Sequence, residues 1–416
     1  MSNRRVRLAD IAELTVGYVG NMAKQYTDTG VKFLRSLNIK PFHIVEDDLK
    51  YISEEFSGSL SKSILHENDL IIVRTGMPGT CCVVPKEYEN CNCADVVIVR
   101  PNLKKVNPHY LAAYINVWGK KQVENNKVGA IQKHFNVKSA EEMLIDLPDL
   151  EQQYKVAKVL TDLNGKIFIN EKINDYLEQQ LQLLYDYWFT QYNFPNEDGQ
   201  PYKASNGLMV WNKMINHLIP ADWKVNSLST ICSFRNGVNY DKNVDGNTIY
   251  KIINVRNISS STLFLDESNF DEICLPKQQG DKYCVSDESI IIARSGIPGA
   301  TRILCNPGSN IIFCGFIICC TPYDDTLQNY LTLYLRQFEG SSATQTGGSI
   351  LKNVSQETLK NLIVPIPPQS LLNQFNDSIL PIYNLINSNT KENVQLITLR
   401  DWLLPMLMNG QATIED

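Results

Sequence analysis

The chain of 416 residues lacks most of the features on which catalytic and metal-binding sites depend. It has five histidines, and none of its 11 cysteines forms the CxxC spacing of a structural zinc site. It also has no GxGxxG or GxxxxGKS/T phosphate-binding motif and no GxSxG nucleophile motif. We therefore predict no catalytic residue and no metal ligand, and we expect the cysteines to be free thiols in a reducing cytosol.

Positive charge and long apolar runs are scarce as well. The net charge of −6 argues against a strongly basic surface for nucleic acid, unless basic residues cluster locally or a partner supplies them. The longest apolar run, Ile311–Cys320, is too short to span a bilayer and is expected to be a buried strand. Arg4, Arg5 and Arg7 are not followed by the apolar stretch of a signal peptide. These features indicate a cytoplasmic protein without a membrane partner.

What the chain does have is an internal repeat. The stretch Arg74–Gly79, with the sequence RTGMPG, recurs 220 positions further on as Arg294–Gly299, with the sequence RSGIPG. Each copy follows a short apolar run, Leu70–Val73 or Ile290–Ala293. This arrangement predicts a strand that runs into a tight turn. Two such turns in one chain indicate a duplication.

Other segments repeat at nearly the same distance. The apolar spacing of an amphipathic helix occurs in Tyr110–Ile115 and again in Tyr330–Leu335. The offset is 219–220 over most of the repeat, and it falls to 216 when the segment around Arg35 is aligned with Ile249–Val255. This consistency makes a chance resemblance improbable and predicts two similar domains.

Each copy is followed by a segment with the apolar spacing of a long helix. In the central segment the apolar residues are Leu160, Leu163, Ile167, Ile173, Leu177, Leu181, Leu184 and Trp188. A second stripe follows the second copy, where Pro381 is expected to kink the helix and Asn389 and Asn393 interrupt the stripe. Neither stripe can be buried on one small domain, so we expect the two helices to pair antiparallel.

The sequence therefore predicts an α+β protein with pseudo-two-fold symmetry. Two similar mixed α/β domains, residues 1–149 and 193–368, are expected to be separated by a pair of long antiparallel coiled-coil helices. The helical spacers cover residues 150–192 and 369–416. The first copy has no counterpart of Pro220–Trp223, so its first element is expected to be shorter or to be completed by the C-terminal tail.

In the order and spacing of its motifs the chain resembles the specificity subunit of type I restriction–modification systems. The resemblance spans nearly the whole chain and starts with the duplicated turns. The further motifs that carry it are the Gly-x-Ile-x-Lys segments at Gly129 and Gly348, Glu151-Gln152-Gln153, Tyr187-Trp188-Phe189 with Phe194-Pro195, and Leu399–Pro405.

The resemblance implies two target-recognition domains that bind double-stranded DNA at an asymmetric, two-part site with an unspecified spacer. It implies no catalysis by the chain itself. Two modification subunits, which are adenine methyltransferases that flip their target base, and further restriction subunits with motor and nuclease activity are the implied partners. S-adenosylmethionine, ATP and magnesium then belong to these partner subunits. A self-sufficient DNA methyltransferase and a coiled-coil scaffold with two protein-binding heads remain as alternatives.

Within this interpretation the arginine of the repeated turn is the first candidate for a DNA contact, because arginine binds guanine bidentately or clamps a phosphate. Other candidates lie at expected strand ends and in the Gly-x-Ile-x-Lys segments. The candidate DNA-binding residues are Arg35, Asn38, Arg74, Thr75, Lys133, Lys251, Asn254, Arg256, Arg294, Ser295 and Lys352. The structural alternatives are a turn shaped by glycine and proline with a salt-bridged arginine, and polar side chains on a solvated face.

Three aromatic residues in the helical segments are candidates for docking the methyltransferase subunits. They are Tyr187, Trp188 and Trp402, and aromatic side chains are favoured at the centres of protein interfaces. Packing between the two helices is the equal alternative for each of them.

Overall fold

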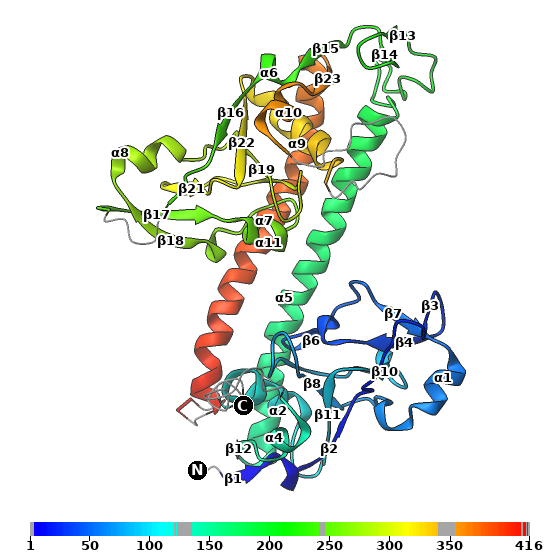
Figure 1. Ribbon diagram of the computed structural model, residues 1–416, viewed down its shortest axis with the longest axis vertical. Helices are drawn as coiled ribbons and strands as arrows, with labels where there is room; N and C mark the ends of the chain where they lie inside the picture. The colour runs from blue at the N-terminus through cyan, green and yellow to red at the C-terminus, as the bar shows by residue number, and fades with distance from the viewer. Residues whose placement is uncertain are drawn as a thin grey trace. The chain divides into compact units, whose positions relative to one another are not determined.

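The computed structural model describes residues 4–119, 122, 135–240, 246–339, 354–408, 411, 412 and 414. The chain forms two compact units, one of Met1–Ile169 with Gln395–Asp416 and the other of Asn170–Val394. Each unit contains one copy of the repeat together with part of each long helix (Figure 1). The boundary between the units therefore lies within both long helices, and neither unit ends where a long helix begins.

The first unit is built mainly from short strands. Its strands are β1 (Arg4–Arg7), β2 (Ala12–Val16), β3 (Tyr26–Thr27), β4 (Val31–Leu34), β5 (Ile39–Lys40), β6 (His43–Ile44), β7 (Lys50–Ile52), β8 (Leu70–Val73), β9 (Cys81–Val83), β10 (Asn92–Cys93), β11 (Val96–Pro101) and β12 (Leu144–Leu147). Its helices are α1 (Glu54–Ser59), α2 (Pro108–Tyr114), α4 (Val137–Glu141), the start of α5 (Leu150–Tyr185) and the end of α11 (Gln369–Met408).

The main sheet of the first unit has the strand order β2-β11-β8-β9 and is covered on both faces. Side chains alternate between the faces of a strand, so Leu70 and Ile72 join a core formed with α2 and the first turns of α5. Ile71 and Val73 point the other way, into a core shared with Leu34 of the second sheet. That second sheet has the order β10-β4-β7-β3. Burial on both faces explains why β8 reads as a continuous apolar run.

The second unit repeats this plan. Its strands are β13 (Met209–Asn212), β14 (His217–Pro220), β15 (Lys224–Ser227), β16 (Cys232–Asn236), β17 (Thr248–Ile253), β18 (Asp271–Leu275), β19 (Ile290–Ala293), β20 (Thr301–Ile303), β21 (Ile311–Phe313), β22 (Ile317–Pro322) and β23 (Ile363–Ile366). Its helices are the end of α5, then α6 (Leu228–Ile231), α7 (Val255–Ser260), α8 (Lys277–Gly280), α9 (Gln328–Arg336), α10 (Gln356–Lys360) and most of α11 (Gln369–Met408).

Strand pairing confirms the duplication. The sheet β16-β22-β19-β20 matches β2-β11-β8-β9, and β18-β17-β21 matches β7-β4-β10. The pair β15–β23 matches β1–β12, and both pairs are antiparallel over four residues. The first element of the first copy is therefore as long as its counterpart. The partner of this first element is β12, so the expectation that it is shorter or is completed by the C-terminal tail is wrong. Leu404 and Leu407 of α11 are buried in the first unit's core.

Hydrogen bonding corrects one part of the expected alignment. Leu34 O accepts from Ala94 N at 2.9 Å, and Ile253 O accepts from Cys314 N at 3.0 Å. Leu34 therefore corresponds to Ile253, which gives an offset of 219 and not the predicted 216. Arg35 then matches Asn254, whereas the sequence had suggested Lys251. The apolar pattern of the sequence alone does not distinguish these two alignments, which differ by three residues.

The two long helices contact each other within each unit. In the second unit Asn170 Nδ2 donates to Asn393 Oδ1 at 2.8 Å, and Asn389 Nδ2 donates to Asn174 Oδ1 at 2.9 Å. Residue numbers rise along α5 as they fall along α11, so the helices pair antiparallel there, as predicted. The asparagines that interrupt the apolar stripe of α11 are thus paired with asparagines of α5, at a position where buried amides favour one helix register.

The cysteines are all free, as expected, and several of them are fully buried in the sheets. None of the helices in the described part of the chain combines the length and the apolar character needed to cross a membrane.

Candidate nucleic-acid interface

The repeated turn has the same backbone geometry in both units. Gly76 and Gly79 have φ angles of 80° and 89°, and Gly296 and Gly299 have φ angles of 79° and 83°. Positive φ is open to glycine without steric cost, which explains both glycines of the motif. Gly79 N donates to Val73 O at 3.1 Å, and Gly299 N donates to Ala293 O at 2.9 Å. The turn is therefore a fixed feature of the scaffold from which its arginine projects.

In the second unit three other loops meet this turn. Arg294 N donates to Phe316 O at 3.0 Å, and Gly315 N donates to Val238 O at 2.8 Å. The link between Cys314 and Ile253 brings the end of β17 to the same place. Val255 joins the turn directly, because a Cβ added to Gly296 would lie 2.8 Å from its Cγ1. The second loop cluster is defined as Val238–Asn239, Asn254–Arg256, Arg294–Gly299 and Gly315–Phe316.

The first unit forms the equivalent cluster. Tyr18 N donates to Cys93 O at 2.7 Å, and Ser36 Oγ donates to Asp95 O at 3.0 Å. Val96 pairs with Val73, the last residue before the turn. The first loop cluster is defined as Tyr18–Val19, Arg35–Ser36, Arg74–Gly79 and Ala94–Asp95. Both clusters thus combine the ends of the same four strands with the turn.

The predicted residues of the second unit mostly lie in its cluster. Arg294 is exposed, and its guanidinium donates a long hydrogen bond of 3.4 Å to Gly315 O. Asn254 Nδ2 donates to Asp271 Oδ2 at 3.0 Å, and Arg256, with 63% of its side chain exposed, forms an ion pair with the same carboxylate. Ser295, within the turn, is half-buried.

Lys251 lies outside this cluster. It is a half-buried residue within β17, two positions before the strand ends, and Glu272 of β18 faces it across the sheet. This side chain belongs to the polar face of a strand, the alternative that the sequence left open.

In the first unit the predicted arginines are more constrained. Arg74 is half-buried and its Nε donates to Phe135 O at 3.1 Å, while Thr75 beside it is also half-buried. The Arg35 side chain is only 20% exposed and pairs with Asp48 at 2.8 Å. Hydrogen bonds from Arg35 and then Lys50 lower the pKa of Asp48 to about 2. Arg35 is thus held by its neighbour within the domain.

Asn38 requires a correction. Its side chain is completely buried. Its amide donates to Val45 O at 3.0 Å and to Asp47 O at 2.9 Å, and its oxygen accepts from Arg35 N. All of these groups shape the loop after β4, so the prediction of a DNA contact is wrong for this residue. Asn257 does the same work in the second unit, where it accepts from Asn254 N and donates to Asn269 O.

The aromatic residues on the helices separate into two groups. Trp188 is only 8% exposed and packs against Phe375 with ring centroids 5.5 Å apart, so its predicted role as an interface anchor is wrong and packing between helices prevails. Tyr187 and Trp402 are 40% and 60% exposed. Each directly follows an aspartate, Asp186 or Asp401. Tyr187 lies in a short π-helical segment, Asp186–Thr190, that continues α5, and Trp402 lies in α11.

Two predicted lysines, Lys133 and Lys352, lie outside the described residues. Sequence reasoning also missed exposed residues inside the clusters, among them Asp95 and Phe316. The strand pairing of the folded chain locates them: Val97 pairs with Val16, whereas Ile318 pairs with Asn236. The offset therefore changes from 220 to 221 at this loop, which marks one extra residue in the second copy.

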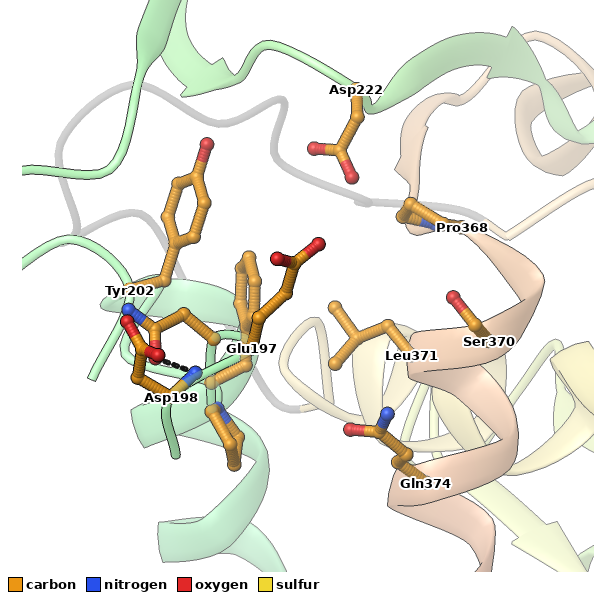
Figure 2. A pocket seen from close by; sticks show the side chains of 11 residues that line it. Glu197, Asp198, Tyr202, Asp222, Pro368, Ser370, Leu371 and Gln374 are labelled. Carbon is orange, nitrogen blue, oxygen red and sulfur yellow. Dashed lines mark hydrogen bonds between the residues drawn. The ribbon is translucent and has the colours of Figure 1, made fainter. Parts of the chain in front are cut away.

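The second unit also has an open pocket of about 450 Å³ beside the first turn of α11 (Figure 2). The carboxylates of Glu197, Asp198 and Asp222 surround it, and its lining contains no histidine, cysteine, lysine or arginine. An acidic pocket repels phosphate, so this face is unsuited to nucleic acid. No group of three or more potential metal ligands occurs among the described residues.

Comparison with known proteins identifies the family. The family described as "Type I restriction modification DNA specificity domain" matches residues 3–179 and again residues 220–396. The chain belongs to this family. The two matches coincide with the two copies of the repeat, each with part of a long helix, so the duplicated loop clusters are features of two specificity domains in one chain.

Individual relatives in the specificity family are distant. The specificity subunit of the type I restriction enzyme MjaIX of Methanocaldococcus jannaschii is 25% identical over 292 residues, which cover 66% of this chain and 62% of that protein. The HindI specificity subunit of Haemophilus influenzae is 20% identical over 372 residues, or 76% of this chain and 80% of that protein. The match thus spans less than two thirds of the MjaIX subunit.

A solved structure shows the same fold. The crystal structure of a type I restriction–modification system S subunit from M. genitalium aligns with 98% of this chain and 99% of its own, with a TM-score of 0.55 and 12% identity. The architecture of two mixed α/β domains with two long helices is therefore that of a specificity subunit.

Proposed function

We propose that this chain is the DNA-recognition subunit of a type I restriction–modification complex, in which each domain binds one half of an asymmetric, two-part DNA site. The observation that supports this most directly is the pair of loop clusters. Both are built on the same strand ends and the same turn, yet they present different side chains. Two domains that share one backbone arrangement but expose different side chains are suited to bind two half-sites of different sequence.

The chemistry of the clusters agrees with this role. In protein–DNA complexes, contacts to phosphate position the protein and contacts to base edges specify the sequence. Arg294 is exposed, and among the described residues its guanidinium makes one long hydrogen bond, so it is accessible to DNA. Arg256 is held by Asp271 in an exposed ion pair, and such pairs contribute little to stability. A phosphate can therefore replace the carboxylate at small cost.

The two exposed aromatic residues suit the docking of two modification subunits. Tyr187 and Trp402 are exposed aromatic residues in different units of the chain, so each offers one anchor to one copy of the same partner. Restriction subunits complete the assembly. S-adenosylmethionine, ATP and magnesium act in these partners, and the complex works in the cytoplasm on double-stranded DNA.

The stoichiometry of the complex tests this docking. Trp402→Ala should leave a complex with one methyltransferase subunit in place of two, and the double variant with Tyr187→Ala should leave none, as measured by native mass spectrometry. The matched control is Tyr176→Ala, which removes an aromatic side chain that is 64% exposed on α5. Two subunits bound to the double variant would refute the assignment of these anchors.

Two experiments separate the proposal from its rivals. The purified chain, incubated with DNA and labelled S-adenosylmethionine, should transfer no methyl groups, and transfer by the lone chain would establish a self-sufficient methyltransferase. The complex with methyltransferase subunits should protect a two-part sequence from cleavage in a footprint. A complex that forms but protects no sequence would favour a protein-binding scaffold.

A further inference from the structure

Phe316 is an exposed aromatic residue on a rigid backbone. Its side chain is 64% exposed, and it lies in a tight turn closed by a hydrogen bond of 3.0 Å from Ile317 N to Cys314 O. Its own carbonyl accepts from Arg294 N at 3.0 Å. Gly237 N donates to Ile317 O at 3.2 Å on the other side. The backbone that carries this side chain is therefore ordered before a partner binds, which lowers the entropic cost of binding.

The position of Phe316 is specific to the second domain. The extra residue in this loop places Gly315 and Phe316 where the first domain has Asp95 alone. Gly315 fits because a Cβ there would lie 1.9 Å from Asn239 Oδ1. Asp95 adopts a φ of 56° and is exposed. The same place in the two scaffolds thus presents a carboxylate in one domain and an aromatic ring in the other.

The surroundings of Phe316 indicate what it contacts. The exposed cations Arg294 and Arg256 belong to the same loop cluster, and this surface suits the phosphate backbone. Within the grooves of DNA the apolar feature that a side chain can read is the C5 methyl group of thymine, and phenylalanine is among the residues that contact it. An exposed aromatic ring in the same loop cluster as two exposed arginines therefore matches a thymine edge flanked by phosphates.

We propose that Phe316 is a specificity-determining residue of the second domain and reads the methyl group of one thymine in the second half-site, while Arg294 binds the adjacent backbone. This proposal rests on the proposed function. Asp95 cannot make an apolar contact, so the first half-site has no equivalent thymine reading at this position.

Deoxyuridine tests the proposal, because it lacks only the methyl group of thymine. Duplexes with each thymine of the two half-sites replaced singly by deoxyuridine would be bound to the complex of this chain with its methyltransferase subunits. One replacement in the second half-site should weaken binding by about fourfold, the value of one buried methyl group. Phe316→Ala should weaken binding of the thymine duplex and abolish the difference between thymine and deoxyuridine.

Control variants keep the result interpretable. Tyr323→Ala removes an aromatic side chain that is 70% exposed just after β22, at the end opposite to Phe316, and it should retain the fourfold difference. Phe316→Leu keeps an apolar group and should retain part of it. A duplex altered only in the first half-site checks that each variant is folded. This alteration should change the affinity of the variant, relative to the unaltered duplex, by the same factor as it changes the affinity of the wild type.

The outcomes separate the two levels of the proposal. If the wild-type complex prefers no DNA sequence, the proposed function fails. If it binds a two-part site but Phe316→Ala leaves the deoxyuridine effect unchanged, or weakens all sequences equally, Phe316 does not read a thymine and the inference is overturned. A second half-site without thymine overturns it as well.

Discussion

Glu178 of α5 fixes the second domain to the long helix. Its carboxylate is only 8% exposed, and it accepts hydrogen bonds from Thr262 Oγ1, from Leu263 N at 3.0 Å and from Arg336 at 3.0 Å. These groups come from the loop after α7 and from α9. Glu178 thus joins three elements of the second unit through one buried side chain.

Replacing Glu178 with alanine should destabilise the second unit strongly. Removing one partner of a buried ion pair costs about 3–5 kcal/mol, and Leu263 N also loses its acceptor. Arg336 keeps 25% of its side chain exposed, so water compensates part of the loss. We therefore expect a loss of about 3 kcal/mol in the free energy of unfolding, at the lower end of that range. For a unit of this size that lowers Tm by roughly 6–12 °C.

The assay combines denaturant unfolding with hydrogen exchange. Exchange should accelerate at Leu263 and in α9, while amides of the first unit such as Val97 should keep their protection. Gln179→Ala, at the exposed neighbouring position, should change the stability by less than about 0.5 kcal/mol. The reasoning is refuted if Glu178→Ala costs less than about 1 kcal/mol and leaves the protection of Leu263 intact.

Two further predictions concern glycine and a surface carboxylate. Gly237→Ala should lower the free energy of unfolding by about 1–3 kcal/mol in a denaturant titration, because the new Cβ would lie 2.1 Å from Cys314 O. Gly58→Ala in α1 is the control: no atom lies within 4 Å of its Cβ, so it should be neutral or stabilising. Equal losses for the two variants would contradict the packing argument. The pKa of Asp48 falls from 3.8 to about 2 in the folded chain because Arg35 bonds it, so its stabilising effect is complete above the unfolded pKa and disappears as the pH falls through the folded pKa. Asp48→Asn should therefore lower the free energy of unfolding at pH 7. It should also make that free energy fall less between pH 4 and pH 2 than it does in the wild type. If the fall is the same in both proteins, the pair of Arg35 and Asp48 does not stabilise the fold.

The repeat made much of the fold predictable. Two copies of the glycine–proline turn located equivalent strand ends, and the structure gives both turns the same positive φ angles. The register near Arg35 was not predicted from the apolar pattern, because Leu34 and Ile253 end short apolar segments that can be aligned in more than one way, and their hydrogen bonds to the neighbouring strand define the match.

The candidate site was predictable in position and less so in its residues. Asn38 follows a strand, as a DNA-contacting residue could, but its role depends on the carbonyls of Val45 and Asp47, which the chain brings back only in the folded loop. Trp188 continues the apolar stripe of α5 into the short π-helical segment Asp186–Thr190, and such a stripe does not distinguish packing against another helix of the chain from binding of a separate protein. Phe316 was overlooked because it continues an apolar run, and only the folded turn exposes it.

The central claim is that each domain reads one half of a two-part DNA site. It is tested most directly by exchanging residues 1–149 for the first domain of another member of the family and mapping methylated adenines across the genome of a host that expresses the complex. The account predicts that one half of the methylated sequence changes while the other half stays the same. A change in both halves, or in neither, would contradict it.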